Sequence, residues 1–169
     1  MNTTTLRVPY RPIIMGLLLM APLAFVLDRA QAGDSHYYPP VTDPVVLEEC
    51  GSCHLAFPPS MLPARSWTVM MANLEDHFGD DASLSADAAR HIEAYLVERA
   101  ADRGGQRYVG KLLRGVGARE APQRISELPK WVHEHDEVRR SRWSEPEVRS
   151  KANCAACHRD AEQGYYDDD

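Results

Sequence analysis

Two pentapeptides of the form Cys-x-x-Cys-His constrain this chain more than any other feature. Residues 50–54 read Cys-Gly-Ser-Cys-His, and residues 154–158 read Cys-Ala-Ala-Cys-His. Two cysteines three positions apart can form thioethers with the two vinyl groups of one haem, and the histidine that follows is placed to bind the iron. The motifs therefore predict two haem c groups, attached through Cys50, Cys53, Cys154 and Cys157, with His54 and His158 as proximal iron ligands.

A zinc site, a redox-active dithiol and structural disulfides are the alternatives, because Cys-x-x-Cys occurs in all three. Histidine makes up 7 of the 169 residues, so it would follow both pairs by chance with a probability of about 0.2 %. The interval from Cys53 to Cys154 also far exceeds the roughly 15 to 20 residues that separate paired zinc half-sites. Two haems would use all four cysteines and leave none for a disulfide.

The N-terminal residues have the pattern of a secretory signal peptide. Arg7 and Arg11 precede an apolar run over residues 13–27, and Ala30-Gln31-Ala32 offers a small-residue cleavage site. This run is shorter than the roughly 20 residues that a transmembrane helix needs. We expect residues 1–32 to be removed and residues 33–169 to act as a soluble periplasmic protein, which suits haem attachment outside the cytoplasm. An uncleaved membrane anchor is the alternative.

Charge narrows the range of partners. Without Arg7, Arg11, Arg29 and Asp28 the chain keeps 16 basic and 24 acidic residues, a formal net charge of −8. An acidic protein of this kind is a poor binder of nucleic acid. The remaining length suits a single compact domain, which we expect to be monomeric.

Helix signals recur between the motifs. Two helices are expected to start at prolines, one at Asp43-Pro44 and one at Pro129. Three more are expected to start at capping residues: one from Ser66 to Phe78, one from Ser85 to about Asp102, and one from the Ser144–Glu147 capping box to Ala152. We expect a mainly α fold with short helices, long loops and little or no sheet. We also expect two dissimilar haem lobes, at about residues 40–104 and 105–169, and a solvated C-terminal tail from Tyr165. In the alternative, the acidic tail lowers the potential of the second haem or docks a basic partner.

Each iron needs a sixth ligand or an open position. His77 is predicted on the apolar face of its helix, and His135 on the side of Trp131. His133, two positions from His135, points away from that side, and His91 reads as a surface residue. The methionines after residue 32, Met61, Met70 and Met71, all lie well before the second motif. Met61 is only seven residues after His54, and Met70 and Met71 read as core. Two histidines on each iron is therefore the economical assignment, with His77 and His135 as distal ligands.

Further segments sharpen this interpretation. They are Glu49-Cys50-Gly51-Ser52-Cys53-His54, Leu62-Pro63-Ala64-Arg65-Ser66-Trp67, His77-Phe78-Gly79-Asp80-Asp81, Trp131 to His135, and Asn153-Cys154-Ala155-Ala156-Cys157-His158. Together they resemble the small bacterial dihaem cytochrome c family over nearly all of residues 33–169. The resemblance implies that both irons carry two histidines, with His77 and His135 distal. It also implies electron transfer to redox partner proteins, such as an oxygen-binding monohaem cytochrome c, the sphaeroides haem protein.

The leading interpretation is therefore an electron carrier with no substrate chemistry of its own. Its partners would be redox proteins, either a monohaem cytochrome c or a membrane cytochrome b. A dihaem peroxidase-like or gas-binding protein, with one open iron, is the main alternative. Such peroxidases resemble two full cytochrome domains and are much longer than residues 33–169. A zinc-stabilised exported binding module is a third class, in which the cysteines would be thiolates without haem.

Overall fold

The computed structural model describes Met1, residues 36–103 and residues 109–167. The predicted signal peptide therefore lies outside the described residues, as do Gly104 and Gly105. Residues 32–169 form one compact unit. Among the described residues, no helix is both long and apolar enough to cross a membrane.

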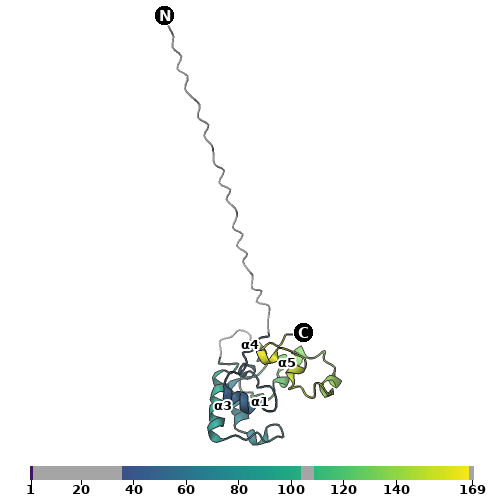
Figure 1. Cartoon of the computed structure of the whole chain (residues 1–169). Coiled ribbons are helices and arrows are strands. Elements are labelled where there is room, and N and C mark those ends of the chain that lie inside the picture. The colour runs from purple at the N-terminus through teal and green to yellow at the C-terminus, as the bar shows by residue number, and fades with distance from the viewer. Residues whose placement is uncertain (2–35, 104–108, 168–169) are drawn as a thin grey trace. The chain divides into compact units, whose positions relative to one another are not determined.

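Short helices joined by long loops make up this unit (Figure 1). The α-helices are α1 (Pro44–Gly51), α2 (Ala64–Met71), α3 (Ala86–Glu98), α4 (Val109–Leu112) and α5 (Pro129–Glu134), and short 3-10 turns lie between them. Across the described ranges, strand-like pairing is limited to two isolated antiparallel bridges, Tyr37 with Tyr165 and His77 with Asp80. The prediction of a mainly α fold with little sheet is confirmed.

Three helix starts follow the sequence signals. Asp43 caps α1 by accepting hydrogen bonds from the backbone N–H groups of Val45 and Val46, at 3.0 and 3.1 Å, and Pro44 occupies the first helical position. The Ser85 hydroxyl caps α3 by accepting from the N–H of Ala88 at 3.2 Å. Pro129 opens α5. The predicted starts of these helices are confirmed, but α3 ends at Glu98 and not at about Asp102 as expected.

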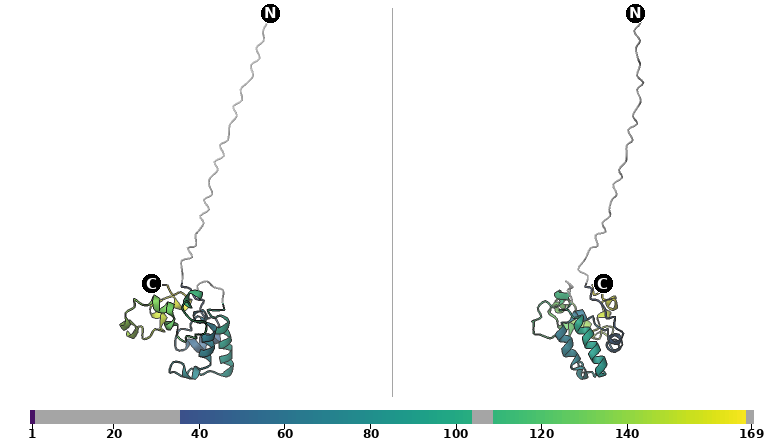
Figure 2. Two further views of the ribbon diagram at one scale, coloured as in Figure 1. Left: turned by 180° about the vertical axis from the view of Figure 1, so that it is seen from behind. Right: turned by 90° about the vertical axis from the view of Figure 1, so that its left-hand side faces the viewer.

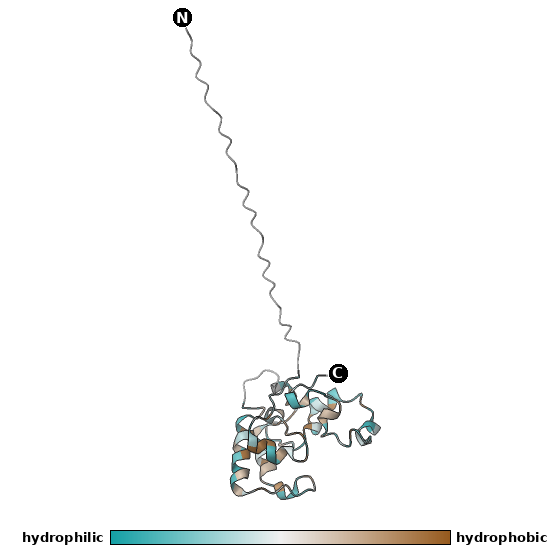
Figure 3. Ribbon diagram, viewed as in Figure 1, coloured by the Kyte–Doolittle hydropathy of each residue, from teal (hydrophilic) through white to brown (hydrophobic). Residues whose placement is uncertain are grey.

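The core lies where α1 and α2 each pack against α3 (Figure 2). Val46, Trp67, Ile92 and Leu96 are each less than 5 % exposed there. Figure 3 shows the strongest hydrophobic colour in this region, around α1. Helix α4 packs against α5 and against the 3-10 turn Pro59–Met61, so it joins the N-terminal helices to the C-terminal ones. The division into two lobes near residue 104 stays a prediction.

The helix expected from Ser66 to Phe78 is wrong at both ends. Helix α2 begins at Ala64 after Pro63, and Ser66 lies inside its first turn, where its side chain is fully buried. The helix stops at Met71, and Asn73 has a non-helical backbone before the 3-10 turn Leu74–Asp76. Apolar spacing alone could not locate this break, because the 3-10 turn continues a similar periodicity.

The helix expected from Ser144 to Ala152 is also absent. Ser144 ends a 3-10 turn, Arg140–Ser144, and only one further turn forms before Arg149 adopts a left-handed backbone with φ +66°. A residue in that conformation cannot continue a right-handed helix. Cys154 is instead delivered by a loop and the 3-10 turn Cys154–Ala156.

The C-terminal tail is not simply solvated, contrary to expectation, because it pairs with the start of the described chain. The Tyr38 N–H donates to the Gly164 carbonyl at 2.8 Å, and the Tyr166 N–H donates to the His36 carbonyl at 3.0 Å. The rings of Tyr37 and Tyr165 lie 4.8 Å apart. Burial raises the pKa of Tyr38 to about 12 and raises the pKa of Tyr166 as well. We call these paired segments, residues 36–38 and 164–167, the terminal clasp.

Arg65 on α2 ties the N-terminal helices to a loop that precedes α5. Its guanidinium donates to the carbonyls of Gly117, at 3.0 Å, and Glu120, and lies 3.4 Å from the Asp102 carboxylate. Hydrogen bonds from a charged donor are stronger than neutral ones. Arg65 therefore holds the loop in place.

We expect Arg65→Ala to lower the free energy of unfolding by about 2 kcal/mol, since two backbone acceptors lose a charged donor at a site only partly open to water. Arg65→Lys should recover less than half of the loss, because an ammonium cannot reproduce the planar fork. Chemical denaturation of the haem-loaded protein measures both. Arg90→Ala is the control, since it removes an exposed ion pair with Asp87; an equal loss in both alanine variants would contradict the assigned role.

Candidate functional site

His54 of the first motif lies opposite His77. Their ring centroids are 6.2 Å apart and their ring planes differ by 20°. Phe57 lies beside His54, with its centroid at 4.9 Å and its plane at 23°. The structure thus brings together the two histidines that the sequence analysis assigned to the first haem.

His77 lies in a tight turn. The expectation that it lies on the face of a helix is wrong. The His77 N–H donates to the Asp80 carbonyl at 2.8 Å, and the Asp80 N–H donates back at 3.3 Å. Phe78 and Gly79, between them, both have left-handed backbones, with φ +59° and +104°. The Arg124 guanidinium lies 3.9 Å above the Phe78 ring, a cation–π contact that anchors the turn.

His158 of the second motif lies opposite His135, with ring centroids 6.1 Å apart and planes at 76°. His135 follows the last residue of α5, and its ring stacks on Trp131 at 3.9 Å and 12°. The prediction that His135 shares a side with Trp131 is confirmed. His133 is exposed and lies 3.8 Å from Asp136, as expected of a surface residue.

Three of these four imidazoles are oriented by backbone carbonyls. The Nδ1 atoms of His54, His135 and His158 lie 2.7, 2.8 and 3.2 Å from the carbonyls of Leu55, Trp131 and Asp167 respectively. A carbonyl oxygen can only accept, so each Nδ1 carries the proton and each Nε2 keeps its lone pair. This is the tautomer that binds a metal through Nε2, with the second nitrogen fixed by a carbonyl.

The separation of both pairs fits a single metal ion between two imidazoles. A metal–nitrogen bond of about 2.0 Å, plus about 1.1 Å from nitrogen to ring centre, places two opposed ring centroids about 6.2 Å apart. The observed separations are 6.2 and 6.1 Å. The residues of both sites therefore fit a six-coordinate iron.

The cysteines lie beside these pairs and are not joined to one another. All four are in the described residues, and the structure contains no disulfide between them. Cys53 and Cys157 are exposed, and Cys50 and Cys154 are half-buried. Burial raises the pKa of Cys50, with a further contribution from the charge of Glu49, and raises that of Cys154 to about 11. Both are therefore neutral thiols at pH 7.

The zinc alternative finds no support in the described ranges, where no three His, Cys, Asp or Glu side chains gather closely enough to hold a metal ion. The remaining candidates are also accounted for. His91 lies 2.9 Å from the Asp43 carboxylate on the surface. Met61 is 4 % exposed in the core, and Met70 and Met71 pack against that core.

Burial lowers the pKa of His77, and the nearby charges of His54 and Arg124 lower it further. The imidazole is therefore neutral at pH 7, the state in which it can bind iron.

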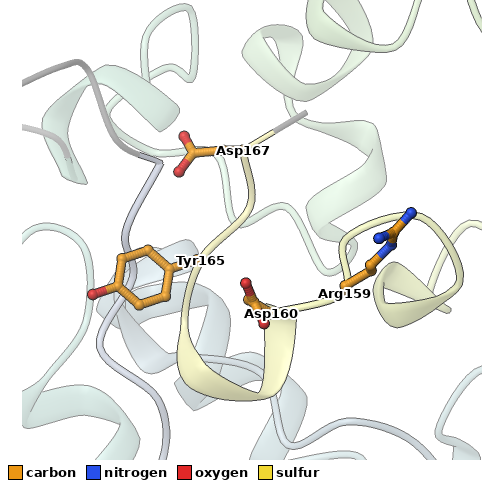
Figure 4. Close-up of a pocket in the computed structure, with 4 residues that line it drawn as sticks. All are labelled: Arg159, Asp160, Tyr165 and Asp167. Carbon is orange, nitrogen blue, oxygen red and sulfur yellow. The ribbon is translucent and has the colours of Figure 1, made fainter. Parts of the chain in front are cut away.

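The sequence analysis placed Trp131 beside His135 but missed the aromatic ring that borders His158. Trp131 stacks on His135, and the Tyr166 ring lies 5.8 Å from His158. The doubled tyrosines at 37–38 and 165–166 were the available signal for the terminal clasp. Near His158, Arg159, Asp160, Tyr165 and Asp167 line a small hollow (Figure 4). Its lining is charged apart from one ring, unlike the apolar surroundings in which a haem ring packs.

The described ranges form a helical fold without a sheet. Each of the two Cys-x-x-Cys-His motifs has a second histidine opposite its own. These features define a c-type cytochrome with two haem sites. The family model for dihaem cytochrome c matches residues 46–166. The chain belongs to the dihaem cytochrome c family, which implies two haem c groups and haem-based electron transfer.

Solved structures agree. The chain is 48 % identical to a dihaem cytochrome c from Rhodobacter sphaeroides, with a TM-score of 0.68, covering 75 % of this chain and 98 % of that one. It is 38 % identical to a dihaem cytochrome c from Shewanella baltica, with a TM-score of 0.59, covering 73 % and 86 %. A search of curated proteins found no match.

Proposed function

We propose that this protein is a periplasmic electron carrier whose two haem irons are each bound by two histidines. His54 and His77 would serve the first iron, and His158 and His135 the second. Cys50 and Cys53 would attach the first haem, and Cys154 and Cys157 the second. The observation that carries the proposal is the opposition of the two imidazole pairs at 6.2 and 6.1 Å.

Closed coordination favours electron transfer over catalysis. A haem with a histidine on each side has no position for peroxide or a gas, and the axial ligands and surroundings set its potential. Two histidines also favour a lower potential than histidine with methionine. The alternative, a peroxidase-like or gas-binding protein, needs an iron from which one of these histidines is absent or displaced.

Redox titration of the haem-loaded protein tests the proposal. We expect two one-electron steps, full reversibility, and no consumption of hydrogen peroxide above that of free haem. Turnover of peroxide, with the spectrum of one haem changing on its addition, would contradict the carrier function and support the alternative.

Export and partners belong to the same proposal. The pattern of residues 1–32 supports a periplasmic protein. Its partners would be redox proteins, namely an oxygen-binding monohaem cytochrome c or a membrane cytochrome b. Mass spectrometry of the exported protein should give residues 33–169 plus two haems. Cys154→Ser with Cys157→Ser should lose one haem; retention of both would refute the second attachment site.

A further inference from the structure

We propose that Trp131 is a positioning residue that holds the His135 ring crossed to the ring of His158, so that the two irons have different ligand-plane angles. The inference rests on the proposed function, because it requires both histidine pairs to bind iron. It goes beyond that function by predicting that the two haems are electronically distinct. It also names the side chain that sets the ligand-plane angle at the second haem.

The second site is rigidly oriented. Trp131 lies flat on the His135 ring, with centroids 3.9 Å apart and planes at 12°. The carbonyl of the same tryptophan accepts from His135 Nδ1 at 2.8 Å. Stacking fixes the plane of the imidazole, and the hydrogen bond fixes its direction within that plane. One residue therefore removes both freedoms that the ring would otherwise keep.

The tryptophan is itself held. Trp143 packs against it with ring centroids 5.6 Å apart, and the Lys151 ammonium lies 5.5 Å from the Trp131 centroid and 5.8 Å from that of Trp143. Trp143 and Lys151 thus form a cation–aromatic cluster with Trp131, and the Trp143 ring also lies 6.1 Å from the His135 ring, tilted by 45°. The plane of His135 is consequently set by the protein, 76° from the plane of His158.

The first site is built differently. His54 lies beside Phe57 at 4.9 Å and 23°, and the planes of His54 and His77 differ by only 20°. Within the described residues, Phe57 lies 4.9 Å from the His54 ring and Phe78 lies 4.8 Å from the His77 ring, both farther than Trp131 lies from His135. The two pairs thus share a separation and differ in ring orientation.

This difference has a measurable electronic consequence. Each imidazole donates π density to the iron d orbital perpendicular to its plane. Two nearly parallel rings raise the energy of the same d orbital and so separate the energies of the pair. Two crossed rings raise the energies of both d orbitals by a similar amount. In oxidised low-spin iron, a split pair gives a rhombic electron paramagnetic resonance signal with three resolved g values. A nearly degenerate pair gives one dominant signal at a much larger g value.

The test is low-temperature electron paramagnetic resonance of the oxidised, haem-loaded full chain. We expect two low-spin signals of equal intensity, one rhombic and one with the large g value. Two rhombic signals would overturn the inference while leaving two-histidine ligation intact. A high-spin signal in the unaltered protein would instead contradict the proposed function, so the two failures are distinguishable.

Variants then identify the residue responsible. Trp131→Leu should shift most of the large-g signal to lower g while the rhombic signal stays in place, and Trp131→Phe, which keeps a stacked ring, should restore most of it. His133→Ala, on the same helix with an exposed ring, is the matched control and should change neither signal. An unchanged large-g signal in Trp131→Leu would overturn the role of Trp131. Trp131→Met serves as a second variant if the leucine variant loses low-spin iron, and is judged by the same shift.

Discussion

Replacing His135 or His77 with alanine is expected to convert one of the two haems from low-spin to high-spin, leaving the other unchanged. Each histidine lies about 6 Å from the histidine of a Cys-x-x-Cys-His motif, at the separation of two ligands on one metal. Without it, water or an empty position replaces a strong-field nitrogen. Optical spectra should therefore show high-spin bands from half of the haem, and the reduced variants should bind one carbon monoxide per protein.

Two other histidines provide the matched controls. His133 is exposed beside Asp136, and His91 lies against Asp43, so His133→Ala and His91→Ala should leave both haems low-spin. A fully low-spin His135→Ala protein would contradict the assignment of the second distal ligand. A high-spin His133→Ala protein would contradict the choice between the two neighbouring histidines.

Among the glycines that the structure describes, Gly164 is the one at which replacement by alanine is expected to cost the most stability. Gly164 has a left-handed backbone with φ +90°, and a Cβ there would lie 2.3 Å from the backbone carbonyl oxygen of Tyr38. No side-chain rotation can relieve a contact with backbone, so the terminal clasp must open. Strain and lost pairing together should cost about 3 to 4 kcal/mol, which corresponds to a drop in Tm of about 10 °C.

Thermal unfolding of the haem-loaded variant measures this loss, and Gly51→Ala is the control. A Cβ at Gly51 meets nothing within 4 Å, and Gly51 belongs to α1, so alanine there should be neutral or slightly stabilising. The absorbance of the second haem should be affected first in Gly164→Ala, because the Asp167 carbonyl of the clasp orients His158. A Gly164→Ala protein as stable as Gly51→Ala would show that the clasp contributes little.

Local chemistry in the sequence predicted three of the five expected helix starts correctly. Asp43 before Pro44, Ser85 as the cap of α3, and Pro129 each act through their own backbone or the next few residues, and the structure contains all three starts. The haem motifs were equally predictable, since two thioethers and one ligand need a fixed short spacing. Signals of this kind do not depend on the rest of the fold.

The turn at His77 could not be predicted in the same way. Apolar spacing over residues 67–78 fitted one continuous helix, but the chain leaves α2 after Met71 and Phe78 takes a left-handed backbone. That conformation is uncommon for a large side chain, and here it is accompanied by the contact of Arg124, 46 residues later in the chain, with the Phe78 ring. His77 does lie opposite His54, but the sequence analysis placed it on a helix face, which is wrong.

Two other expectations failed, one local and one long-range. Locally, Ser144–Glu147 fits a capping box, but Arg149 ends the turn after Glu145. The tail looked solvated because nothing in its own sequence shows that Tyr165 and Tyr166 pair with residues 36–38. Contacts between segments more than 120 residues apart depend on the whole fold.

The central claim is that two haem irons are each closed by two histidines. Its most direct test is the optical spectrum of the haem-loaded protein. The spectrum is recorded for the oxidised and then the reduced protein, before and after addition of carbon monoxide. We predict two low-spin haems in both states and a reduced spectrum that carbon monoxide does not change. A high-spin fraction, or a reduced band that shifts with carbon monoxide, would show that one iron is open and would contradict the claim.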